Sequence, residues 1–98
     1  GFVQIADIHR KNLFGWLGLA LVPGARGRGL GTRALAAAEA AAVADLGLRK
    51  LLLQVRADNA AALALYGRAD WRRVGTLQAQ YDDGAAQHDV VICEKVLA

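Results

Sequence analysis

The feature that most constrains this chain is a glycine-rich segment, residues 23–31, that joins an apolar run to an alanine-rich one. The apolar run, residues 17–22, predicts a strand, and the alanine-rich run predicts a helix. Glycine has no Cβ, so the backbone of such a turn can approach a ligand and direct several N–H groups at it. The start of the helix adds unpaired amides and the positive end of its dipole. Together with Arg26, Arg28 and Arg33, these features predict a site for a diphosphate.

The glycine spacing excludes two common phosphate-binding motifs. A dinucleotide fingerprint, Gly-x-Gly-x-x-Gly, that started at Gly27 would need its third glycine at Thr32. A P-loop that started at Gly24 would need a lysine at the position that Leu30 fills. A diphosphate site in this segment would therefore follow a different motif.

The pattern that the segment does contain is Arg26-x-x-Gly29-x-Gly31. It resembles the acetyl-CoA loop of the GNAT superfamily of N-acetyltransferases, Arg/Gln-x-x-Gly-x-Gly/Ala. By itself the pattern also fits a glycine-rich turn that only caps a helix. A second segment, residues 59–66 (NAAALALY), resembles the family's Asn-x-x-Ala-x-x-Leu-Tyr signature and follows the first by one helix and one strand. Two motifs in the right order are far more specific than either one.

The resemblance covers residues 1–97 and implies an α/β fold, a GNAT-like mixed sheet with helices on its faces. We expect a single domain over residues 1–98. The family's first strand and first two helices have no counterpart in the sequence, so we expect the domain to be incomplete at its N-terminus. Of the 98 residues, 55% are hydrophobic and 21% are charged, which suits one folded domain with a core.

Hydrophobic patterns and turn residues predict strands over residues 1–8, 13–22, 51–55, 71–80 and 88–97, and helices over residues 32–46 and 59–68. The first two strands should form a hairpin. A helical crossover should make the third strand parallel to the second and cover both its faces. Gly47 should end the first helix, and Asp58 or Asn59 should cap the second. Asp70 stands where the family commonly has a glycine, and we expect aspartate to tolerate the left-handed conformation there.

The resemblance implies where acetyl-CoA binds. Backbone amides from Arg26 to Thr32 would hold the diphosphate, and the strand before them would bulge and splay from its parallel neighbour to admit the pantetheine arm. The residues expected to bind the cofactor are Leu21, Val22, Arg26, Gly27, Arg28, Gly29, Gly31, Thr32 and Asn59. The side chains of Arg26 and Arg28 are equally compatible with exposure to solvent. Asn59 has two compatible roles, as a helix cap and as a contact to the cofactor arm.

Tyr66 is the candidate catalytic residue. Its phenol can donate a proton to a leaving thiolate, and the high pKa of tyrosine keeps it protonated at neutral pH. The matching tyrosine has this role in many members of the family, and an aromatic core residue is the alternative. Residues 13–22 contain no carboxylate, although many relatives have a glutamate there that acts as the general base. The remaining candidates for the base are Asp7, Asp82, Asp83 and His88, and each is also typical of a solvated loop or strand end.

The function that the resemblance predicts is acetyl-CoA-dependent N-acyl transfer, in which a primary amine of unidentified structure attacks the thioester directly. One alternative is a non-catalytic CoA-binding or interaction module, and another is a module for a different phosphorylated ligand. The net charge of +3 suits a phosphorylated ligand. The arginines alternate with glycines rather than aromatics, so we expect no nucleic-acid partner.

The remaining composition bears on compartment and assembly. The single cysteine, Cys93, lies in a strand pattern, forms no internal disulfide and suits a reducing cytoplasm. The sequence shows no signal peptide, no run long enough to span a membrane and no metal-ligand pattern. A sheet without its first strand would expose an edge, and we expect a homodimer or a partner segment to cover that edge.

Overall fold

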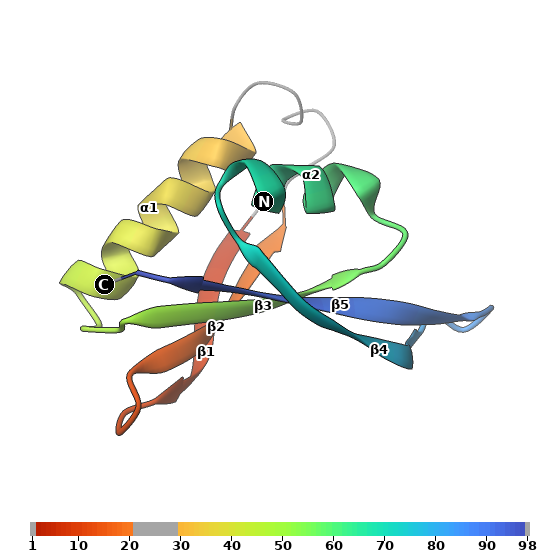
Figure 1. The fold of residues 1–98 in the computed structure, drawn as a ribbon, viewed down its shortest axis with the longest axis horizontal. Coiled ribbons are helices and arrows are strands. Elements are labelled where there is room, and N and C mark those ends of the chain that lie inside the picture. The colour runs from red at the N-terminus through yellow and green to blue at the C-terminus, as the bar shows by residue number, and fades with distance from the viewer. Residues whose placement is uncertain (1, 21–29, 98) are drawn as a thin grey trace. The chain divides into compact units, whose positions relative to one another are not determined.

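The computed structural model describes residues 2–20 and 30–97 (Figure 1). In chain order the elements are β1 (Phe2–His9), β2 (Phe14–Ala20), α1 (Leu30–Ala44), β3 (Lys50–Arg56), α2 (Ala60–Arg68), β4 (Arg72–Asp82) and β5 (Gln87–Val96). The strands form one sheet in the order β1-β2-β3-β5-β4. This mixed five-stranded sheet with two helices confirms the predicted fold class. By its contacts the chain forms two compact units, residues 1–52 with 96–98 and residues 53–95.

The first unit begins with the predicted hairpin. β1 and β2 pair antiparallel, from Phe2↔Ala20 to Ala6↔Trp16. The register then shifts before His9. Asp7 supplies this shift by adopting a φ of 50°.

Gly15 of β2 lies close to side chains of the same unit. A Cβ on this residue would lie 3.1 Å from a side-chain carbon of Ile5 and 3.2 Å from one of Leu48. Gly15 is therefore needed for close packing inside the unit. β2 also pairs in parallel with β3, as the helical crossover predicted.

α1 packs its small apolar residues into the core of the first unit. Leu35, Ala38 and Ala42 are buried at helical spacing. The helix begins at Leu30 rather than at Thr32. Gly47 ends it as predicted, with a φ of 64°, and the next residue, Leu48, is buried.

The second unit contains α2 and the β4–β5 hairpin. Asn59 is the cap of α2, because its side chain accepts the N–H of Ala62 at 3.1 Å. Asp70 follows the helix with a φ of 67°, so aspartate does adopt the left-handed conformation expected of it. β3 is not covered on both faces as predicted: Leu53 and Val55 are buried, whereas Gln54 is exposed.

β4 and β5 pair antiparallel, and the pairing is interrupted twice, between Arg73 and Gly75 and between Leu77 and Tyr81. Ala79 lies in the second interruption with a φ of 49°. Its N–H leaves the strand ladder and donates to Oδ1 of Asp89 at 2.9 Å. The side chain of Asp89 therefore stabilises a bulge at a position where the sequence has no glycine that would predict one.

Candidate active site

The described part of the predicted cofactor site is the first turn of α1. Gly31 is half-buried there and Thr32 is exposed, and the turn contains no acidic residue. The first N–H groups of a helix have no partner within the helix, and in a turn without an acidic residue they fit a diphosphate. Six predicted cofactor residues, Leu21, Val22, Arg26, Gly27, Arg28 and Gly29, lie outside the described residues.

The strand that leads to this turn has a short parallel ladder. Within the first unit the ladder of β2 with β3 comprises Phe14↔Lys50, Gly15↔Leu51 and Trp16↔Leu52, and β2 itself continues to Ala20. The splay from the parallel neighbour that the resemblance implies for the pantetheine arm falls on residues 19–22, of which Leu21 and Val22 lie outside the described residues.

The predicted cofactor and catalytic residues of the second unit lie at α2: Asn59 caps this helix and Tyr66 lies within it. Tyr66 is 7% exposed, and its ring packs tilted against Trp71 with the centroids 6.0 Å apart. Burial, and to a lesser degree the charge that Cys93 can carry, raises the pKa of Tyr66. The phenol is therefore protonated at neutral pH, as a proton donor must be. Tyr66 is thus a core aromatic residue as well as the candidate acid.

Cys93 is buried, as the strand pattern predicted. Burial raises its pKa, so the thiolate that a nucleophile needs is disfavoured. This thiol is a core side chain.

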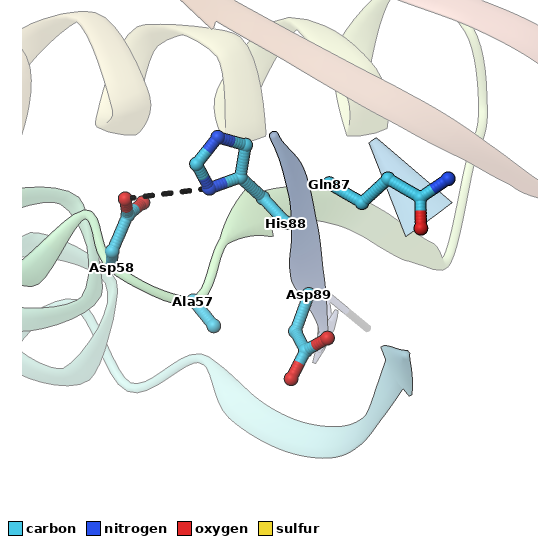
Figure 2. Close-up of a pocket in the computed structure, with 5 residues that line it drawn as sticks. All are labelled: Ala57, Asp58, Gln87, His88 and Asp89. Carbon is cyan, nitrogen blue, oxygen red and sulfur yellow. Dashed lines mark ion pairs between the residues drawn. The ribbon is translucent and has the colours of Figure 1, made fainter. Parts of the chain in front are cut away.

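The structure also reveals a polar cluster that sequence reasoning did not assemble. Residues from the turn after β3 and from the start of β5 line a shallow, open depression: Ala57, Asp58, Gln87, His88 and Asp89. In Figure 2 the side chains of Asp58 and His88 point toward one another, with Nδ1 of His88 3.7 Å from Oδ2 of Asp58.

Two further charged residues complete this cluster. Arg56 holds Asp58 through two bonds, Nε to Oδ1 at 3.1 Å and Nη2 to Oδ2 at 2.7 Å, and these bonds lower the pKa of the Asp58 carboxyl. On the other side, Oδ2 of Asp83 lies 2.6 Å from Nε2 of His88. The sequence named Asp83 and His88 only as separate candidates. Arg56, whose Nη2 lies 3.3 Å from Nδ1 of His88, is 32 positions away in the sequence, and no local pattern predicts such a contact.

Among the described residues, no helix is both long and apolar enough to cross a membrane.

Comparison with known proteins identifies a family and a fold. Residues 1–71 match the model of the acetyltransferase (GNAT) family. Mutant forms of the spermidine/spermine N-acetyltransferase SpeG from Vibrio cholerae share the fold, with a TM-score of 0.90 at 20% identity, over 97% of this chain and 57% of that one. The same enzyme in complex with CoA and spermine matches with a TM-score of 0.90 and 20% identity, over 97% of this chain and 56% of that one.

A third similar structure is a dodecameric form of spermidine N-acetyltransferase from the same organism, again with a TM-score of 0.90 and 20% identity. It too is matched over 97% of this chain and 56% of its own length, so this chain spans little more than half of the proteins it resembles. At this identity the similarity establishes the fold. The match to the family model covers most of the sequence, and the chain belongs to the GNAT family of acetyltransferases.

Proposed function

We propose that the chain is the cofactor-binding part of an acetyl-CoA-dependent N-acyltransferase, which moves an acetyl group to a primary amine by direct attack, without an acyl-enzyme. The observation that carries the proposal is the position of both motifs. The glycine-rich loop and the segment of residues 59–66 fall inside the family match, and each leads into or lies on a helix of the structure. A loop that ends in a helix start without acidic residues is suited to the diphosphate of coenzyme A.

In this proposal each group of residues has a separate role. Amides from Arg26 to Thr32 bind the diphosphate, and backbone groups of Leu21, Val22 and the strand before them orient the arm that carries the thioester. Tyr66 donates a proton to the departing sulfur. Its ring is buried and packs against Trp71. Asn59 caps α2 and adds a polar contact to the cofactor arm.

The proposed acceptor is a small amine. SpeG from Vibrio cholerae, which shares the fold, has been solved with CoA and spermine. We also propose that the protein works in the cytoplasm and assembles with copies of itself or with a partner segment, since a similar structure is dodecameric. Light scattering of the chain at micromolar concentration tests the assembly, and a stable monomer that does not aggregate would contradict it.

A thiol-release assay tests the enzymatic proposal. Free coenzyme A is measured while the chain, or a longer form of the protein, is incubated with acetyl-CoA and a panel of primary amines. Release that depends on the amine supports the transferase. Binding of acetyl-CoA in isothermal titration without any thiol release favours the non-catalytic module. The chain spans little more than half of the similar structures, which is the observation that supports this alternative. Absence of binding favours a different phosphorylated ligand.

A further inference from the structure

The proposed reaction uses Tyr66 as its proton donor, and this inference rests on that proposed function. A proton donor works only when it is held in place, because a misplacement of about 1 Å can cost about 100-fold in rate. Tyr66 lies in the last turn of α2, a helix of nine residues. Helix ends fray, and their last carbonyls need partners from outside the helix. The contacts that fix this end of α2 therefore also fix Tyr66.

α2 ends in a Schellman motif in which the carbonyl of Tyr66 is one of the two acceptors. It accepts the N–H of Trp71 at 3.0 Å, and the carbonyl of Gly67 accepts the N–H of Asp70 at 3.3 Å. Asp70 has the left-handed backbone that the motif requires at this position, with a φ of 67°. The rings of Tyr66 and Trp71 make the apolar contact that commonly accompanies the motif. Trp71 therefore contacts Tyr66 at both its backbone and its ring.

The two bonds of the motif do not include the carbonyl of Ala69, the residue at the C-cap of α2. This carbonyl accepts a hydrogen bond from Nζ of Lys95, 2.7 Å away and partly buried. The ammonium group lies at the negative end of the helix dipole, where a positive charge is stabilising. A hydrogen bond from a charged donor is also stronger than one between neutral groups. Lys95 thus ties the end of α2 to β5.

β5 directs a second side chain toward the same helix. Residues two apart in a strand point to the same face, so Cys93 and Lys95 lie on one side of β5. Cys93 is close enough to Tyr66 for the charge that its thiol can carry to contribute to the raised pKa of the phenol. Glu94, between the two, points to the opposite face and accepts a hydrogen bond from β4. One face of β5 therefore meets α2 near Tyr66 and again at Ala69.

We propose that Lys95 is a positioning residue for Tyr66, which it keeps in place by binding the carbonyl at the end of α2. The ammonium group acts through the backbone of Ala69, three residues after Tyr66, and has no contact with the reacting atoms in this role. Without it the last turn of α2 opens more readily, and the phenol meets the departing sulfur less often. Loss of Lys95 should therefore slow the chemical step. It should leave acetyl-CoA binding unchanged, since residues 26–32 hold the diphosphate in the proposed function.

Substitution of Lys95 tests the proposal. Lys95→Met removes the charge and the donor but keeps an unbranched side chain, and Lys95→Arg keeps both the charge and a donor. Arg68→Met is the matched control, because Arg68 is an exposed cation in the last turn of the same helix. Each variant is assayed for thiol release with acetyl-CoA and 1,4-diaminobutane, and its thermal unfolding midpoint is measured.

The proposal predicts a loss in kcat that is specific to Lys95. We expect Lys95→Met to lower kcat by about 10-fold, with the KM for acetyl-CoA within about twofold of the wild-type value. Lys95→Arg should recover most of that loss, and Arg68→Met should leave kcat unchanged. If Lys95→Met does not fold, Lys95→Gln, which keeps a neutral donor, takes its place in the same comparison.

A double substitution separates a positioning residue from a helix cap that only stabilises the fold. Once Tyr66→Phe has removed the hydroxyl, Lys95→Met should cost no further activity, because residues that act as one unit have non-additive effects. If the loss persists in the Tyr66→Phe background, or if Lys95→Met lowers the unfolding midpoint and leaves kcat unchanged, Lys95 does not position Tyr66, although the transferase stands. If the wild-type protein shows no amine-dependent thiol release, the proposed function fails and the role of Lys95 fails with it.

Discussion

Ala79 offers the sharpest test of the described backbone. It is an alanine with a φ of 49° in the second interruption of the β4–β5 pairing. In this left-handed region the Cβ of an L-residue is crowded, and glycine is the residue that avoids the penalty. We therefore expect Ala79→Gly to stabilise the protein.

The magnitude follows from two opposing effects. The left-handed conformation costs an alanine about 1–2 kcal/mol, which glycine recovers. Glycine also gives the unfolded chain more freedom, which costs about 0.4–1 kcal/mol. The net gain is then about 1 kcal/mol in the free energy of unfolding. For a domain of this size such a gain raises Tm by about 4–8 °C.

Urea unfolding followed by circular dichroism measures the change, with a matched control. Ala64 is an exposed residue of α2, so Ala64→Gly makes the same chemical change in an ordinary helical conformation. It should destabilise the protein by about 1 kcal/mol. Changes of opposite sign in the free energy of unfolding of the two variants support the bulge. If Ala79→Gly lowers stability as much as Ala64→Gly does, Ala79 does not have the left-handed backbone and the reasoning is refuted.

Two other predictions concern side chains of the second unit. The folded-state pKa of Asp83 is depressed, so its stabilising effect is present above its unfolded pKa of about 4 and is lost as the pH falls below that value. The thermal unfolding midpoints of the wild type and Asp83→Asn should therefore differ at pH 6 and converge as the pH is lowered. A difference that stays constant over this pH range would contradict the linkage. Tyr66→Phe keeps the ring against Trp71 and removes the hydroxyl, so thiol release should fall by about 100-fold with unchanged CoA affinity and unfolding midpoint; full activity would eliminate Tyr66 as the acid.

Much of the fold could be predicted from local sequence signals. The glycine at position 47 and the aspartate at position 70 both take the left-handed conformations that their residue types favour. The caps, the strand runs and the alanine-rich helix likewise depend on near neighbours in the chain. The start of α1 was predicted too late, because Leu30 belongs to a glycine-rich run that obscures where the helix begins.

The features that the sequence did not predict depend on contacts distant in the chain. Asp7 and Ala79 adopt positive φ values without being glycine, because the pairing strands impose their bulges. The close approach of side chains of β1 and Leu48 to Gly15 likewise brings together residues that are separate in the sequence. The Asp83–His88 pair forms only when the β4–β5 hairpin closes. Sequence reasoning could name both residues but had no means to pair them.

The most direct test of the central claim compares a ligand that carries the diphosphate with one that lacks it. Isothermal titration is run with coenzyme A and with pantetheine, which has the thiol arm but lacks the diphosphate together with the phosphorylated adenosine. Charge-assisted hydrogen bonds to several amides are worth about 1.5–3 kcal/mol each, so coenzyme A should bind at least about tenfold more tightly, equivalent to 1.4 kcal/mol. Equal affinity for the two ligands, or no affinity for coenzyme A, would contradict the claim that this loop binds its diphosphate.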